Sequence, residues 1–331
     1  MAGLIELDSV EILLDPISPS PTPAVQQTGG LKDLGIFGTS ITTGDRGDAK
    51  KELRMDSICC GAHGLSLLIT GISGDKRHTI LFDTGPEERV FELNANRLKA
   101  PLGAIEAIQL SHWHRDHSGG MLKVLSMTEA AGAKPVTVDL HPARPDYRGI
   151  MTPMGPISLE ADPTFDEIAA AGGILDKHDE AHNVLEDFFT VSGEIPRVTD
   201  YELGIKRGVR FTKETGKWED DTLMKDERFL MCKLKDKGIV VFTGCSHAGV
   251  VNASRHALDL GSGSPLYAVM GGYHLADGEP ELISKSVSDL KALDPRLLLT
   301  GHCTGWRAKF EIQTQMPGRI VPSFVGSRFV L

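Results

Sequence analysis

The chain has 331 residues, 40% of them hydrophobic and 24% charged, so it is long enough to bury a large core. A formal net charge of −10 argues against a general nucleic-acid-binding protein, which needs a basic surface. The sequence shows no signal peptide and no run of about eighteen apolar residues that would predict a membrane helix. Its five cysteines form no Cys-x-x-Cys pair, which favours a reducing compartment. We therefore expect a cytoplasmic protein with no nucleic-acid or membrane partner.

The N-terminal part is predicted to consist mainly of strands. Leu4–Leu14 alternates loosely and is typical of a strand, whereas Asp15–Gly30 is rich in Pro, Ser, Thr and Gly and predicts a loop. Two apolar runs, Gly64–Thr70 and His78–Phe82, flank turn residues and predict a hairpin. The next two elements are a helix that begins at Pro86 and a strand, at Pro86–Leu98 and Ile105–Leu110.

The segment after that strand, His112-Trp113-His114-Arg115-Asp116-His117, holds three histidines and one aspartate. Imidazole nitrogens and carboxylate oxygens suit zinc, iron(II) and manganese. Four such donors on one tight turn cannot all face one ion, so we expect His112 and His114 to face one metal and Asp116 and His117 a second. A metal pair lowers the pKa of bound water and can hold a hydroxide, which indicates hydrolysis. The alternative is a solvated polar turn.

The region from Leu140 to Asp236 is polar, is broken by Gly and Pro, and gives the weakest signals. Short helices are predicted at Thr164–Ala171 and Glu180–Phe188, and a hairpin with a charged tip within residues 202–237. The region is longer than a connection needs, so we expect residues 140–237 to cover the active site or to form a subunit contact. The chain is otherwise expected to form a single domain over residues 1–331.

The C-terminal part alternates strands with helices. The predicted elements are strands at Gly238–Thr243, Tyr267–Met270 and Leu297–Thr300, and helices at Val250–Leu260 and Glu281–Ala292. Each strand is followed by glycine and by histidine or cysteine, in Gly244-Cys245-Ser246-His247, Gly272-Tyr273-His274 and Gly301-His302-Cys303. Ligands at the carboxyl ends of strands are the usual arrangement in layered α/β folds.

The order of these motifs resembles the metallo-β-lactamase superfamily from about Leu4 to Gly305. Shorter motifs are similar to the branch often labelled 7,8-dihydropterin-6-methyl-4-(β-D-ribofuranosyl)aminobenzene-5′-phosphate synthase-like: His63-Gly64-Leu65-Ser66, Ser192–Arg197, Gly244–His247, Gly272–Leu275 and His302–Gly305. The resemblance implies an α/β fold, an αββα sandwich of two mixed β-sheets flanked by helices. A dinuclear site would lie at one edge of the sandwich.

The resemblance also implies a ligand set. His112 and His114 look like ligands of the first metal, and Asp116, His117 and His302 like ligands of the second. We expect two divalent ions, Zn²⁺ first, with Fe²⁺ or Mn²⁺ as alternatives.

Three further residues are expected to bind the metals or to orient their ligands. Asp83 resembles an aspartate that orients the histidine cluster by hydrogen bonding. Many members have a bridging aspartate where this chain has Cys245, which is either a ligand or a buried thiol that only packs. A His-Thr-x-Gly-His segment is missing, and His247 is expected to supply the third ligand of the first metal instead of merely capping a helix.

The remaining site predictions concern catalysis and substrate binding. Asp116 and His274 are expected to be catalytic; His274 would orient the substrate or protonate a leaving group, unless it is a structural histidine. Glu194, Arg197 and Tyr273 are expected to bind substrate, and a structural Arg–Glu pair is the alternative for the first two.

The predicted function is hydrolysis of a small molecule. A cyclic amide (lactam) or lactone is the first choice, because an acidic chain with few basic clusters suits a small neutral ring. Alternatives are a phosphodiesterase and the synthase of the branch label, a transferase that joins a dihydropterin diphosphate to an aminobenzene ribotide. The transferase would need cations at the site, for which only Arg115, Arg144 and Arg197 are candidates. A non-catalytic binding protein is disfavoured because the metal ligands are retained, and a homodimer is a further expectation.

Overall fold

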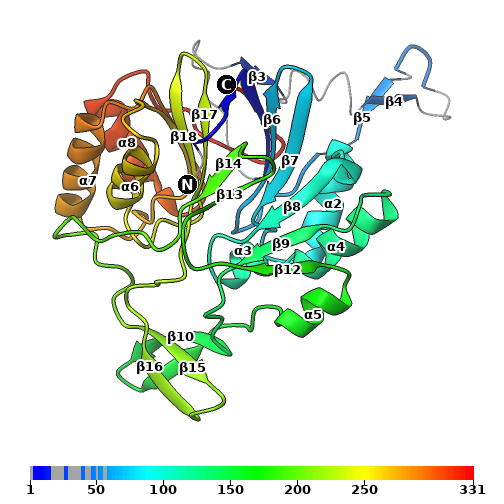
Figure 1. The fold of residues 1–331 in the computed structure, drawn as a ribbon. Helices are drawn as coiled ribbons and strands as arrows, with labels where there is room; N and C mark the ends of the chain where they lie inside the picture. The colour runs from blue at the N-terminus through cyan, green and yellow to red at the C-terminus, as the bar shows by residue number, and fades with distance from the viewer. Residues whose placement is uncertain (1–2, 16–25, 29–38, 42–45, 50, 55–57) are drawn as a thin grey trace.

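The computed structural model describes residues 3–15, 26–28, 39–41, 46–49, 51–54 and 58–331. Two large β-sheets pack face to face, and helices cover the outer face of each (Figure 1). Both sheets contain parallel and antiparallel pairs. The predicted αββα sandwich is therefore confirmed.

The first sheet has eight strands within the described residues. In spatial order they are β12 (Ile174–Lys177), β9 (Thr137–Leu140), β8 (Ile105–Gln109), β7 (Lys76–Phe82), β6 (Ser66–Ser73), β2 (Ser9–Asp15), β21 (Arg328–Val330) and β3 (Gln26–Thr28). β6 and β7 form the predicted hairpin, whose turn contains Gly74 with a φ of 57°. β7, β8, β9 and β12 run parallel, so their carboxyl ends share one edge.

In the part of the chain that the structure describes, the second sheet has seven strands. They are β13 (His182–Val184), β14 (Phe189–Val191), β17 (Leu230–Leu234), β18 (Gly238–Thr243), β19 (Leu266–Gly271) and β20 (Leu297–Thr300), with β1 (Glu6–Leu7) paired to β17. β18, β19 and β20 are parallel, so their carboxyl ends also lie together. The three C-terminal strand predictions are confirmed, because each of these segments is a short buried apolar run.

Leu4–Leu14 was predicted as one strand, and the structure divides it at Asp8. β1 pairs with β17 of the second sheet, whereas β2 pairs with β6 of the first. Leu7 and Val10, on either side of the break, are both fully buried in the core between the sheets. The N-terminal segment thus joins both layers of the sandwich.

Helices cover the outer faces of both sheets. Against the first sheet lie α2 (Glu88–Leu98), α4 (Met121–Ala130) and α5 (Phe165–Ala170); against the second lie α6 (Val250–Leu260), α7 (Pro280–Ala292) and α8 (Trp306–Gln315). Short helical turns are α3 (Arg115–Ser118), Leu102–Ala104 and His302–Thr304. Thr164 forms a capping box with Glu167 at the start of α5, the helix predicted there. In the described part of the chain, no helix has both the length and the apolar character that a membrane span requires.

Three local predictions are wrong. Glu180–Phe188 forms no helix, because Leu185, Glu186 and Asp187 adopt left-handed φ angles of 52°, 54° and 65° in the turn between β13 and β14. Pro86 lies before α2, which begins at Glu88. The expected loop Asp15–Gly30 contains β3; residues 16–25 and 29–30 lie outside the described residues.

A small separate sheet comes from the region that was expected to elaborate the fold. Its strands are β11 (Gly155–Ser158), β10 (Tyr147–Thr152), β15 (Gly208–Thr212) and β16 (Lys217–Asp220), and it projects below the sandwich in the view of Figure 1. The turn between β15 and β16 exposes Lys213 and Glu214, as predicted for a hairpin with a charged tip. A two-stranded pair, β4 (Thr39–Ile41) and β5 (Lys51–Leu53), completes the strands.

Candidate metal centre

The predicted metal ligands come from loops that follow parallel strands. The segment His112–His117 follows β8 of the first sheet, whereas Cys245 and His247 follow β18 and His302 follows β20 of the second. Because the carboxyl ends of these strands meet at one edge of the sandwich, side chains far apart in the sequence are brought together. They form two clusters, His112 with His114 and His247, and Asp116 with His117, Cys245 and His302.

In the first cluster three ring nitrogens face one another. His112 Nε2 and His247 Nε2 lie 3.0 Å and 3.2 Å from His114 Nδ1. Burial lowers the pKa of all three side chains, that of His114 to about 3. Neutral imidazoles with converging lone pairs are the state in which histidine binds a metal. The donor set of the first cluster therefore fits a divalent cation.

In the second cluster a thiol, two imidazoles and a carboxylate converge. Cys245 Sγ lies 3.1 Å from both His117 Nε2 and His302 Nε2, and Asp116 Oδ2 lies 3.3 Å from His302 Nε2. Tetrahedral zinc would separate such donors by about 3.3–3.6 Å. The sulfur thus lies where a ligand would be, although the sequence alone left open whether Cys245 only packs. This donor set also fits a metal ion.

The electrostatics of the second cluster favour a cation. Burial alone would lower the pKa of His302, but the neighbouring Cys303 and Asp116 outweigh it and raise the value to about 10. Burial alone would also lower the pKa of His117, but the carboxylates of Asp116 and Asp83 outweigh it and raise that pKa. The excess negative charge that holds these protons would also attract a divalent ion.

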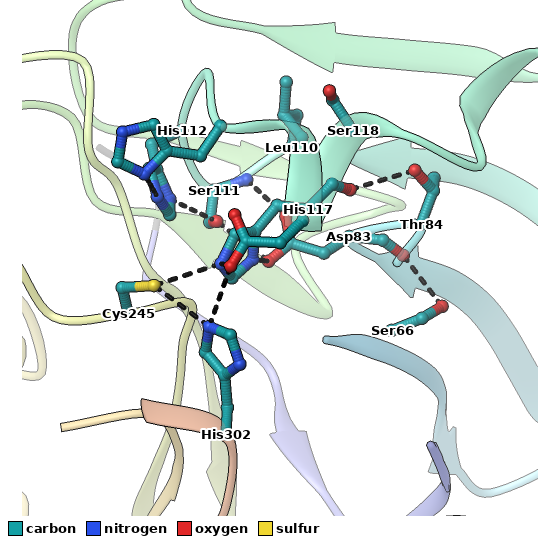
Figure 2. Close-up of polar contacts among 12 residues, drawn as sticks. Ser66, Asp83, Thr84, Leu110, Ser111, His112, His117, Ser118, Cys245 and His302 are labelled. Atoms are coloured by element: carbon teal, nitrogen blue, oxygen red, sulfur yellow. Dashed lines mark hydrogen bonds and ion pairs between the residues drawn. The ribbon is translucent and has the colours of Figure 1, made fainter. Parts of the chain in front are cut away.

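Asp83 connects the two clusters through His117 and Ser111 (Figure 2). It is fully buried, and its Oδ2 lies 2.6 Å from His117 Nδ1 and 2.8 Å from Ser111 Oγ, while Oδ1 accepts a hydrogen bond from Ser111 N. Ser111 Oγ also lies 2.9 Å from His112 Nδ1. Because a carboxylate only accepts hydrogen bonds, His117 must carry its proton on Nδ1 and leave Nε2 for the cluster. The predicted orienting position of Asp83 agrees with this geometry.

Backbone strain accompanies these loops. Asp83, Ser246, His274 and His302 have φ angles of 59°, 62°, 47° and 46°, in the left-handed region that non-glycine residues rarely adopt. Each lies at most three residues beyond the end of a strand. Such conformations cost about 1–3 kcal/mol each and persist where the surrounding structure holds them, typically at functional sites.

A cavity of about 220 Å³ opens beside both clusters. One part of its lining belongs to the clusters, and the other comes from the small sheet and its neighbours. The small-sheet side includes Arg148, Ile150, Leu159, Ile205, Val209 and Asp221.

Of the residues predicted for catalysis and substrate binding, Asp116 and His274 line this cavity. The exposed His274 ring contacts the ring of His247 edge-on, with centroids 4.3 Å apart. Glu194, Arg197 and Tyr273 are not among the described lining residues.

The three side chains outside the cavity are engaged elsewhere. The exposed Glu194 lies 3.6 Å from Lys225 Nζ. Arg197 donates hydrogen bonds to the carbonyls of Ile195 and Leu223. The buried hydroxyl of Tyr273 donates to Val269 O, 2.9 Å away. Backbone groups or a surface lysine occupy the polar ends of these side chains, and their substrate contacts stay predictions.

Sequence reasoning missed several buried charges at the site. Glu227 accepts hydrogen bonds from the backbone N–H groups of His247 and Ala248 and so fixes the ligand loop. Arg148 and Asp226 form a buried ion pair beside the cavity. The charged run Lys225–Arg228, directly before the apolar start of β17, was the available signal that charges here would be buried.

Comparisons with known proteins agree with this arrangement. Residues 62–199 match the family model described as "Metallo-beta-lactamase superfamily". The curated 7,8-dihydropterin-6-methyl-4-(beta-D-ribofuranosyl)-aminobenzene-5'-phosphate synthase of Methanocaldococcus jannaschii is 28% identical over 259 residues, 75% of this chain and 82% of the relative. The solved structure of Tm1679, described as a metal-dependent hydrolase of the beta-lactamase superfamily, has a TM-score of 0.65 at 24% identity, covering 82% of this chain and 92% of its own. Residues 62–199 are therefore similar to the metallo-β-lactamase superfamily, and the solved structure shows that the chain shares its fold.

Proposed function

We propose that this protein is a dinuclear metal hydrolase that opens a small cyclic amide or ester. Members of the superfamily are generally metal-dependent hydrolases. The observation that carries the proposal is the convergence of two groups of potential metal ligands on one cavity of about 220 Å³, a size that suits a small molecule.

His112, His114 and His247 would hold one ion, and Asp116, His117, Cys245 and His302 the other. Bound divalent ions would lower the pKa of water and polarise a carbonyl group. The thiol of Cys245 favours zinc over the harder iron(II) and manganese ions.

The side chains around the ions have separate tasks. Asp83 sets the tautomer of His117 directly and orients His112 through Ser111. His274 has an exposed ring at the cavity. Burial alone would lower its pKa, but Cys303 and Glu227 raise it, so a protonated ring could pass a proton to a leaving nitrogen or oxygen. The apolar side chains of Ile150, Leu159 and Val209 limit water in the remainder of the cavity.

Charge at the cavity supports a neutral ring over a polyanion. Arg148 is the one arginine or lysine among the described lining residues. Its guanidinium is already paired with Asp226 at 2.5 Å and with Asp221 at 3.2 Å. Among the described lining residues, no arginine or lysine is therefore free for a diphosphate.

A transferase is the second candidate, because the curated relative from Methanocaldococcus jannaschii is named as a synthase. The arginines considered for its phosphates have other partners. Arg115 lies 3.3 Å from Glu160, and Arg144 donates to the carbonyls of Asp162 and Pro163. These contacts favour hydrolysis of a small neutral ring over the synthase reaction.

The test is a screen of the zinc-loaded protein against a lactam, a lactone, a thioester and bis-nitrophenyl phosphate. A parallel assay would follow diphosphate release from a dihydropterin diphosphate and an aminobenzene ribotide. We expect turnover of the lactam or lactone, abolished by replacing His112 and His114 together with Ala. The control variant His78→Gln, at a largely buried histidine that is not among the described cavity residues, should keep full activity. Turnover confined to the phosphodiester or to the condensation would refute the proposal, and so would full activity in the double variant.

A further inference from the structure

One wall of the cavity carries a buried group of three charged side chains. Arg148 lies on β10, and Asp221 and Asp226 lie in the segment between β16 and β17. The side chains of Arg148 and Asp226 are 3% and 4% exposed, and that of Asp221 is 11% exposed. Arg148 and Asp221 border the cavity, whereas Asp226 is not among its described lining residues.

The two carboxylates differ in the hydrogen bonds that they accept. Asp226 accepts hydrogen bonds from Arg148 Nη2 at 2.5 Å and from Trp113 N at 2.9 Å. Asp221 Oδ2 approaches Arg148 Nη2 at 3.2 Å, but among the described residues it has no hydrogen-bond partner. Arg148 Nε is likewise buried without a partner. A buried polar atom without a hydrogen-bond partner lowers the stability of the folded protein unless a ligand or a solvent molecule supplies the partner. Each of these two atoms therefore requires an explanation.

The charges of the group do not balance. One guanidinium faces two carboxylates, and Asp226 already satisfies it with the shorter contact. A hydrogen-bond donor from a ligand would compensate the remaining carboxylate better than an anion would. The neighbouring lining residues Ile150, Leu159 and Ile205 are apolar, so the rest of such a ligand would be apolar too.

We infer that Asp221 is a specificity-determining residue that accepts a hydrogen bond from an N–H group of the substrate, and that Arg148 positions its carboxylate. This rests on the proposed function and narrows its substrate class. The substrate would be a small, largely apolar cyclic amide or ester that bears an N–H donor. A ring with acceptors alone would leave Asp221 Oδ2 buried without a hydrogen-bond donor, which selects against such a ring.

Binding of small amides to the zinc-loaded protein tests this inference. The probes are 2-piperidone and N-methyl-2-piperidone, unstrained lactams that differ in a single N–H group, with dissociation constants from ligand-observed NMR. A hydrogen bond to a carboxylate predicts that the wild type binds 2-piperidone about tenfold or more tightly than its N-methyl analogue. Asp221→Asn should reduce this preference, and Asp221→Leu should remove it.

The adjacent residue provides a matched control. Asp220 is exposed, accepts a hydrogen bond from Thr222 Oγ1 and is not among the described cavity residues, so Asp220→Asn changes the same formal charge outside the site. It should keep the tenfold preference. If the preference persists in Asp221→Leu, the methyl group is excluded sterically and the inference is wrong. Absence of the preference in the wild type overturns it as well.

The outcomes separate this inference from the proposed function. Selective binding without hydrolysis of any ring would overturn the hydrolase and leave the role of Asp221 intact. Hydrolysis of a lactam or lactone without N–H selectivity would do the reverse. If Asp221→Leu fails to fold, Asp221→Asn compared with Asp220→Asn still decides, because both retain the size of the native side chain.

Discussion

Replacing Asp83 with Asn should weaken both metal sites through one change of hydrogen-bond polarity. The Oδ1 position would still accept from Ser111 N, but the other position would become an NH₂ group facing His117 Nδ1 and Ser111 Oγ. Two donors would then oppose each other, so His117 would move its proton to Nε2, the atom that faces the second cluster. The Ser111 hydroxyl would lose its carboxylate acceptor and could donate to His112 Nδ1 instead, which would move the His112 proton to Nε2 and alter the first cluster too.

The expected magnitude follows from this geometry. Loss of an orienting partner of a metal-bound histidine costs about 10–100-fold in metal affinity, or about 1.4–2.7 kcal/mol. Because Asp83 contacts His117 directly at 2.6 Å and His112 only through Ser111, the second site should lose more. Ser111→Ala should weaken the first site and leave the Asp83–His117 contact in place.

Competition between the protein and a chromophoric zinc chelator measures both affinities, and elemental analysis gives the number of ions bound. Asp83→Asn should show two weakened sites, and Ser111→Ala one. Wild-type affinity at both sites in Asp83→Asn would refute the idea that Asp83 controls the tautomers.

Two further predictions concern the thiol and a buried carboxyl. Cys245→Ser should lose the ultraviolet charge-transfer band of the cadmium-substituted protein, whereas the exposed Cys60→Ser should keep it; an unchanged band in Cys245→Ser would show that this sulfur is not a ligand. Burial raises the pKa of Asp162 to about 6, so its contribution to stability is present below about pH 4 and is lost as pH rises to about 6. At pH 7, Asp162→Asn should therefore need more urea to unfold than wild type, because its free energy of unfolding is higher by up to about 3 kcal/mol. At pH 4 the variant should have no such advantage. The exposed Asp166→Asn should show no such pH-dependent gain, and equal gains at both pH values would contradict the assignment.

Sequence patterns predicted which potential ligands lie together in the local part of the candidate site. His112–His117 occupies one turn after a buried strand, so its donors had to be close, and the apolar runs at β18, β19 and β20 identified the parallel edge. The residues on the other side of the cavity were harder to predict from the sequence. Arg148 and Asp221 meet only because β10 pairs with β15 in a sheet built from polar segments without clear alternation. The helix predicted at Glu180–Phe188 was wrong for the opposite reason: the local sequence was compatible with a helix, but the segment forms a turn with three left-handed residues.

The origin of the ligands gives the metals a second consequence. In each cluster some donors follow strands of the first sheet and others follow strands of the second, as with His117 and His302. An ion at either position would therefore cross-link loops of the two sheets. Such a cross-link would shorten the loops available to the unfolded chain. Metal supply would then govern the lifetime of the folded protein as well as its chemistry. An apoprotein would open first along this seam, exposing to proteases a core that the loaded protein keeps closed.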